Sequence, residues 1–179
     1  MPAGAWTARI DPLKTVERLW TAWRMEYIKS LKVDSGECIF CRALSSHSDR
    51  EHLVLYRGRL AMLMLNLYPY NPGHLMIAPN RHISTLSDLS AEEGAELMSL
   101  AALGERILAD AHKPQGFNLG VNLGRCAGAG VPDHLHLHLV PRWMGDTNFM
   151  PVMAETRVLP EEISTTYDRL YEALKKAKA

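Results

Sequence analysis

The sequence has no excess of either charge, few cysteines and no long apolar run. Twenty Lys and Arg balance twenty Asp and Glu among 179 residues, so we expect neither a nucleic acid nor a membrane surface as partner. The longest apolar run, residues 60–65, is too short to span a bilayer. Charged side chains interrupt the first residues, which therefore lack a secretion signal's apolar core. Three cysteines exclude a disulfide framework and favour a cytoplasmic protein.

What the chain does contain is enough for one folded domain. Hydrophobic residues make up 47% and charged residues 22%, which is ordinary for a globular protein. Alternating or short apolar segments predict strands at 60–67, 74–78, 117–123 and 134–139. The glycine-rich connection between the last two favours antiparallel pairing, because parallel strands need a long crossover. We therefore expect an α+β protein with an antiparallel sheet, a long helix and a C-terminal helix.

Two helices carry start signals. Ser90 and Glu93 form a capping box, and apolar residues then recur at helical spacing up to Lys113. Pro160 suits a helix start, and the apolar pattern after it predicts a helix with lysines at its end. Residues 12–30 are rich in aromatics and are expected to form an irregular or helical arm.

The most informative segment alternates three histidines with three leucines over residues 134–139. In an extended strand, side chains two residues apart share one face, so this segment would bury Leu135, Leu137 and Leu139 and align the three imidazoles opposite them. A lone histidine is usually a satisfied polar residue, but a row of three suggests a function. Metal ligation and nucleophilic or acid–base chemistry at phosphorus or an acyl group are both open.

A second motif, Cys38 and Cys41 with two residues between them, has the spacing of one half of a zinc site, which needs two further ligands. By itself it could also be a chance occurrence or a redox pair. His82 and one histidine of the row could complete a closed tetrahedral site, which would be structural rather than catalytic. Cys126 is treated as incidental.

The loop before the histidines is rich in glycine. Gly124, Gly128 and Gly130 could leave backbone N–H groups open to an oxyanion, although a simple hairpin turn explains them equally well. Arg142 could meet a phosphate or be a surface charge. Two asparagines are candidates for ligand contact, or ordinary turn and edge residues: Asn66 and Asn122.

The segment 134–140 resembles the signature of the histidine triad (HIT) nucleotide-binding superfamily. The resemblance extends to residues 71–79 and 120–122, and it covers roughly residues 37–145. The stretches 19–28, 38–41 and 140–149 are most similar to the zinc-bearing branch that contains bacterial diadenosine tetraphosphate phosphorylases. The resemblance implies that the α+β fold has an antiparallel sheet of about five strands. It also divides the chain into an N-terminal arm that packs on the domain (1–36), a HIT-like domain (37–145) and a C-terminal extension with its helix (146–179).

The resemblance implies a role for each matching residue. His136 would attack the α-phosphorus of a nucleotide and become nucleotidylated, and His138 would hydrogen-bond phosphate or leaving-group oxygens. Asn66 would hold the ribose and Asn122 a phosphate, with amides of the loop at Gly128 and Gly130 steadying the developing charge. In zinc-bearing relatives two cysteines and two histidines hold the metal. Mapped here, they are Cys38, Cys41, His82 and His134.

The implied activity is transfer of a nucleotidyl group from a dinucleoside polyphosphate, with phosphate or water as acceptor. A nucleoside phosphoramidase and a zinc-stabilised nucleotide-binding module without catalysis are the alternatives. Family members usually form dimers, and the helix after Ser90 is the candidate interface. One departure matters: many hydrolases have Gln and then Ser or Thr where this chain has Ala129 and Gly130, so side-chain donors to phosphate are lost there.

Overall fold

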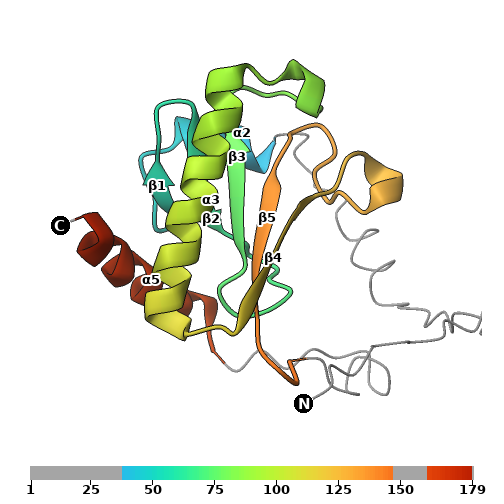
Figure 1. The fold of residues 1–179 in the computed structure, drawn as a ribbon. Helices are drawn as coiled ribbons and strands as arrows, with labels where there is room; N and C mark the ends of the chain where they lie inside the picture. The colour runs from blue at the N-terminus through green and yellow to red at the C-terminus, as the bar shows by residue number, and fades with distance from the viewer. Residues whose placement is uncertain (1–37, 147–160, 179) are drawn as a thin grey trace, which may run out of the picture.

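The computed structural model describes residues 38–146 and 161–178, which form one antiparallel sheet flanked by helices (Figure 1). The five strands are ordered β1-β2-β3-β5-β4. Their bounds are β1 (Val54–Arg57), β2 (Ala61–Leu65), β3 (Leu75–Pro79), β4 (Gly116–Val121) and β5 (Leu137–Arg142). The helices are α2 (Ile39–Ser45), α3 (Ala91–His112) and α5 (Ile163–Lys178), with short 3₁₀ turns at Leu86–Asp88 and Arg125–Ala127. This confirms the α+β class; the expected arm at 12–30 lies outside the described residues.

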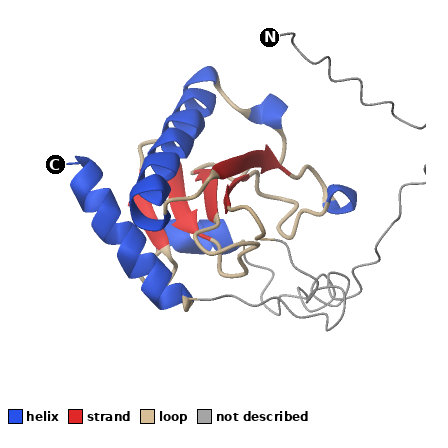
Figure 2. Cartoon of the chain, turned by 60° about the horizontal axis from the view of Figure 1, so that its bottom comes forward, coloured by secondary structure: helices blue, strands red, loops and turns tan. Residues whose placement is uncertain are grey.

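Both faces of the central strands are buried. On one face Leu63, Ile77 and Leu139 pack against α3 and α5, which lie side by side (Figure 2). On the other face Met62, Met76 and their neighbours pack against Phe40 of α2. Because successive side chains of a strand point to opposite faces, the strand pairing decides which residues share a face. Among the described residues, no helix is both long and apolar enough to cross a membrane.

The two predicted helices are present. The Ser90 hydroxyl accepts from the Glu93 N–H, and the Glu93 carboxylate accepts in return from the Ser90 N–H. The C-terminal helix starts at Ile163 and belongs to the core: Leu170 is fully buried, and the Tyr167 hydroxyl donates to the Val54 carbonyl at 2.8 Å. Helix α5 therefore packs on the sheet.

Three details differ from the sequence-based expectation. The strand predicted from residue 134 begins only at Leu137, because the preceding backbone leaves β3 and the Leu135 N–H bonds to the carbonyl of Ile83 instead. Strand β4 lies at the sheet edge, and Leu119, which the alternation places on the apolar face of this strand, is 45% exposed. The short elements α2 and β1 were not predicted.

The carboxyl group of Glu93 provides a pH-dependent contribution to stability. Hydrogen bonds from the Arg81 guanidinium and then from the Ser90 N–H hold the pKa of Glu93 at about 2, below its ordinary 4.5. A lowered folded-state pKa means that the contribution is complete above about pH 4.5 and lost as the pH falls toward 2. The free energy of unfolding is measured by urea denaturation at a series of pH values from neutral down to about 2. We expect Glu93→Gln to be less stable than wild type at neutral pH and to lose less stability on acidification. Parallel pH profiles would contradict this.

Candidate active site and metal site

The three histidine rings lie next to one another on the α2 side of the sheet. His134 is fully buried and His136 is 4% exposed, whereas His138 is partly exposed. The ring centroids of His136 and His138 are 4.9 Å apart, with one ring edge toward the other. Leu137 and Leu139 point into the opposite core against α3, as the alternation predicts.

The hydrogen bond of His136 determines which of its nitrogens is reactive. Its Nδ1 lies 2.7 Å from the carbonyl oxygen of His134. A carbonyl can only accept, so Nδ1 carries the proton and Nε2 keeps its lone pair. Burial of the ring lowers the pKa of His136, against the opposing effect of this hydrogen bond, and favours the neutral form. Phe40, with its ring centroid 4.9 Å away, forms one wall beside the ring.

The ring of His134 faces the cysteine pair. Its Nε2 donates to the Pro79 carbonyl at 2.9 Å, which leaves the Nδ1 lone pair toward the Sγ atoms of Cys38 at 3.2 Å and Cys41 at 3.7 Å. His82 Nδ1 lies 3.2 Å from Cys41 Sγ. All four ligand atoms lie within 4.8 Å of one another.

This arrangement fits a tetrahedral metal ion. With metal–sulfur bonds of about 2.3 Å and metal–nitrogen bonds of about 2.0 Å, neighbouring ligand atoms are separated by roughly 3.6 Å. The observed separations of 3.2 and 3.7 Å lie around that value. Two thiols and two imidazoles form a donor set that suits zinc. The four residues named from the sequence are therefore brought together as a candidate metal site.

A fourth histidine belongs to the row, and sequence reasoning missed its role. His74, directly before β3, is fully buried, and its Nε2 lies 3.0 Å from His138 Nδ1. The pairing of β3 with β5 sets Met76 opposite His138 and so brings the two imidazoles together. The available signal was an imidazole directly before a strand of five buried residues.

The remaining predicted ligand contacts lie around these rings. The amide nitrogen of Asn66 is 3.2 Å from His74 Nδ1, and that of Asn122 is 3.5 Å from His138 Nε2. In the glycine loop the Gly128 N–H donates to the Arg125 carbonyl at 3.0 Å, so it is already used within the turn. The amide of Gly130 has no such loop contact among the hydrogen bonds of the described segments.

Arg142 is held by protein groups. Its guanidinium makes two hydrogen bonds to the Asp146 carboxylate, at 2.6 and 2.8 Å, and one to Asn118. Asp146 also accepts from the side chain of Asn71, which fastens the turn before His74 to the end of β5. Of the two interpretations of Arg142, a phosphate ligand or a surface charge, the structure favours the surface charge, which is 42% exposed and paired with Asp146.

We expect Asp146→Ala to destabilise the protein. The change removes the acceptor for Arg142 and Asn71, and charge-assisted hydrogen bonds of this kind contribute about 2 kcal/mol to the free energy of unfolding. Urea denaturation checks the loss. Asp168→Ala, which breaks an exposed ion pair with Arg50, is the control and should change stability far less. Equal losses of stability in the two variants would show that the hydrogen bonds of Asp146 contribute no more than an exposed ion pair.

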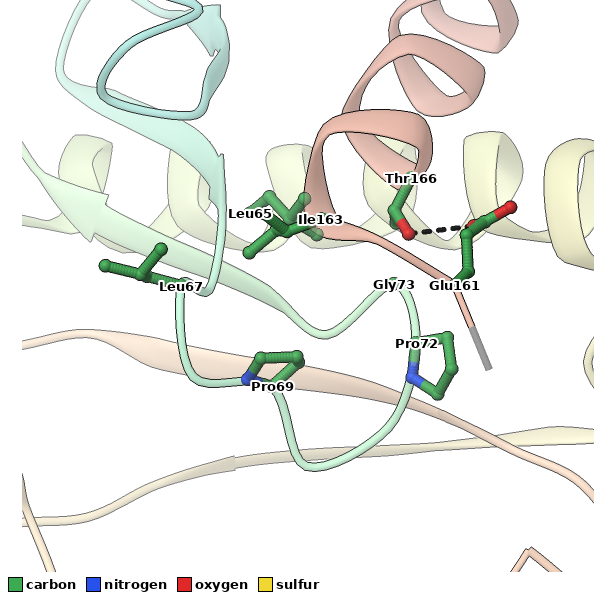
Figure 3. A pocket seen from close by; sticks show the side chains of 8 residues that line it. All are labelled: Leu65, Leu67, Pro69, Pro72, Gly73, Glu161, Ile163 and Thr166. Atoms are coloured by element: carbon green, nitrogen blue, oxygen red, sulfur yellow. Dashed lines mark hydrogen bonds between the residues drawn. The ribbon is translucent and has the colours of Figure 1, made fainter. Parts of the chain in front are cut away.

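A small hollow of about 50 Å³ lies beside the turn at residues 69–73 (Figure 3). It separates Pro69 and Pro72 of the turn from the start of α5, where the Thr166 hydroxyl donates to Glu161. None of its lining residues is a histidine, so it is not part of the candidate site.

Comparison with known proteins identifies the family of this chain. The HIT domain family model matches residues 48–144, more than half of the chain. A Mycobacterium tuberculosis protein named AP-4-A phosphorylase is 41% identical over 157 residues, which cover 84% of this chain and 80% of that protein. The asymmetrical bis(5'-nucleosyl)-tetraphosphatase of Schizosaccharomyces pombe is 32% identical over 93 residues, 52% of this chain and 50% of that one.

The fold is similar to that of solved HIT structures. A zinc-bound histidine triad family protein from Mycobacterium smegmatis aligns with a TM-score of 0.63 at 23% identity, covering 79% of this chain and 96% of that one. The row of imidazoles, the sheet that carries it and the family match agree, and this chain belongs to the HIT domain family.

Proposed function

We propose that this protein is an enzyme that cleaves dinucleoside polyphosphates, with diadenosine tetraphosphate as the preferred candidate, through a nucleotidyl group bound covalently to His136. The observation that carries the proposal is the hydrogen bond from His136 Nδ1–H to the His134 carbonyl, which leaves Nε2 as the nucleophilic nitrogen. The names of the relatives, one a phosphorylase and one a tetraphosphatase, support this substrate class.

The reaction has two transfers at one phosphorus atom. In the first, Nε2 of His136 forms a bond to the α-phosphorus while the bond to the bridging oxygen breaks, and ATP leaves. In the second, an oxygen of phosphate or water attacks the same phosphorus, breaks the nitrogen–phosphorus bond and restores the imidazole. Phosphate as acceptor gives ADP, and water gives AMP.

The neighbouring groups would bind and orient the nucleotide. His138 would contact the phosphate and leaving-group oxygens, Asn122 a phosphate and Asn66 the ribose. In the glycine loop the amide at Gly130 is the better donor to the developing charge, since the Gly128 N–H is engaged in the turn. The HIT-like domain would comprise residues 37–145, flanked by the arm (1–36) and the extension (146–179).

Product analysis tests the activity and identifies the acceptor. Purified protein is incubated with diadenosine tetraphosphate, with and without phosphate, and the nucleotides are separated by chromatography. ATP with ADP in the presence of phosphate identifies a phosphorylase, and ATP with AMP in its absence a hydrolase. Intact dinucleotide under both conditions contradicts the proposal. Adenosine phosphoramidate, cleaved in place of the dinucleotide, would identify a phosphoramidase, and AMP binding without turnover a binding module.

We further propose that Cys38, Cys41, His82 and His134 hold one structural zinc ion per chain. The fit of their ligand atoms to a tetrahedron supports this, as does the partly buried position of the cysteines. Bound zinc would cross-link α2 to the segments around β3 and β5 and so stabilise the fold, leaving the phosphorus chemistry to the histidines. Elemental analysis of protein prepared with zinc would give about one equivalent, and its absence would contradict the proposal.

We also propose that the protein forms a homodimer, which sedimentation would test. We propose a cytoplasmic location as well. Apolar side chains are exposed on the expected interface helix α3 and on the edge strand β4. They are Met98 at 54%, Leu119 at 45% and, just after the strand, Leu123 at 42%. Such residues favour burial against a second copy.

A further inference from the structure

We propose that His74 is a positioning residue that fixes His138 as a hydrogen-bond donor at Nε2. This inference rests on the proposed function, because the donor matters only if a phosphate or leaving-group oxygen binds beside His138. It concerns a residue to which the family signature at 134–140 assigns no role, and it follows from the hydrogen bonds around the buried ring of His74.

The first step concerns His74 Nδ1. The backbone N–H of Tyr70 donates to this nitrogen at 3.1 Å, and a backbone N–H can only donate. The side-chain amide of Asn66 lies 3.2 Å from the same nitrogen. Its oxygen is already the acceptor for the Tyr68 N–H at 2.9 Å, so the NH₂ end is the one that faces His74. Nδ1 of His74 is therefore an acceptor and carries no proton.

The second step concerns the position of the proton on the ring of His138. With Nδ1 unprotonated, the proton of neutral His74 is on Nε2, which lies 3.0 Å from His138 Nδ1. The His74 Nε2–H donates, and His138 Nδ1 accepts. In neutral His138 the remaining proton must then be on Nε2.

The third step is the consequence at the site. The nitrogen of the Asn122 amide lies 3.5 Å from His138 Nε2, a separation at the outer limit of a hydrogen bond. A protonated Nε2 requires this amide to turn over and present its oxygen, because an NH₂ group cannot accept. His138 is the partly exposed member of the row. A protonated Nε2 can donate to an oxygen that gains negative charge as the phosphorus–oxygen bond breaks. The other tautomer would aim a lone pair at that oxygen and repel it. The two neighbouring imidazoles would thus have opposite tasks: His136 Nε2 attacks and His138 Nε2 donates.

The burial of His74 fixes its tautomer. His74 is fully buried, and Tyr70 covers it with ring centroids 4.6 Å apart. A tautomer change of His74 would leave the Tyr70 N–H facing a protonated nitrogen in a buried site, which costs far more than the small intrinsic preference between tautomers. The turn that supplies these donors is fastened by Asn71 to Asp146.

The direct test is nitrogen-15 NMR of the full chain labelled at histidine, which distinguishes protonated from unprotonated ring nitrogens. We expect His74 and His138 both to be protonated at Nε2 and His136 at Nδ1, without substrate. His138 protonated at Nδ1, or averaged between both forms, would overturn the proposal. This measurement needs no variant and does not depend on activity.

Two nearly isosteric substitutions then test the catalytic consequence. In His74→Gln the amide nitrogen can still donate to His138 Nδ1, so we expect kcat within about tenfold of wild type. In His74→Glu the carboxylate accepts from Nδ1 and imposes the opposite tautomer, so we expect kcat to fall about 10²-fold or more with little change in KM, as for other histidines held in the wrong tautomer. Equal losses in both variants, with NMR showing folded protein and unchanged tautomers, would show that His74 acts only in packing.

Failure of this inference is distinguishable from failure of the proposed function. If wild-type protein forms no nucleotidyl-histidine and cleaves no dinucleoside polyphosphate, the function is wrong whatever the tautomers are. If it does both while His138 carries its proton on Nδ1, the function stands and the role of His74 is wrong.

Discussion

Replacing His136 by alanine is expected to lower kcat for diadenosine tetraphosphate by about 10⁴-fold or more. The ring supplies the attacking nitrogen, and loss of a covalent nucleophile in other enzymes has effects of this size. KM should change much less, because the groups proposed to bind the ribose and phosphates remain. Steady-state kinetics with product separation measure both constants.

Trapping the intermediate makes the same test more specific. Rapid acid-free quenching of the wild-type reaction should show an adduct heavier by one adenylyl group, located by peptide mapping at His136, and the alanine variant should show none. His47→Ala is the matched control, since His47 is exposed and distant in sequence from the row, and it should react as wild type does. Near-normal turnover of the His136 variant would refute the assigned nucleophile.

Removing a metal ligand is expected to have the largest effect on stability. Cys41→Ala leaves three of the four candidate ligands and removes the Sγ atom that lies 3.2 Å from His82 Nδ1. A metal ion that binds the folded state and not the unfolded state stabilises the fold. We therefore expect the loss of this ligand to lower the free energy of unfolding by about 3 kcal/mol and Tm by roughly 10 °C. Calorimetry and zinc analysis of the same preparations measure the two effects.

Cys126→Ala provides the control, because it removes an exposed thiol that lies outside the four-residue cluster. It should keep its zinc and its Tm. Chelation of wild-type protein should reproduce the loss in Tm seen for Cys41→Ala. A zinc-free variant that melts at the wild-type temperature would show that the cluster does not stabilise the fold.

Local patterns in the sequence predict a large part of this molecule. The alternation at 134–139 identifies the histidine face. The capping box at Ser90 marks the start of α3 at the correct residue. These two features depend on neighbours within a few positions, so they can be read without the fold. The partners of the cysteine pair, in contrast, are indicated by the resemblance to zinc-bearing relatives and not by a local pattern.

The rest depends on contacts between distant residues. The contact between His74 and His138 arises from the pairing of β3 with β5 and joins residues 64 positions apart. The place of His74 directly before an apolar strand is the one local signal, and it does not identify the partner. Helix α2 and strand β1 are too short for a periodic pattern to stand out. The use of the Gly128 N–H within its own turn is decided by backbone dihedrals, which composition does not specify.

Phe40 stands between the two thiols in the chain, and its ring centroid lies 4.9 Å from those of both His134 and His136. We therefore expect a reagent that alkylates Cys38 or Cys41 to lower activity by displacing this aromatic wall, without occupying the nucleotide's place. Such inhibition would be noncompetitive toward substrate, and occupancy of the metal would protect against it.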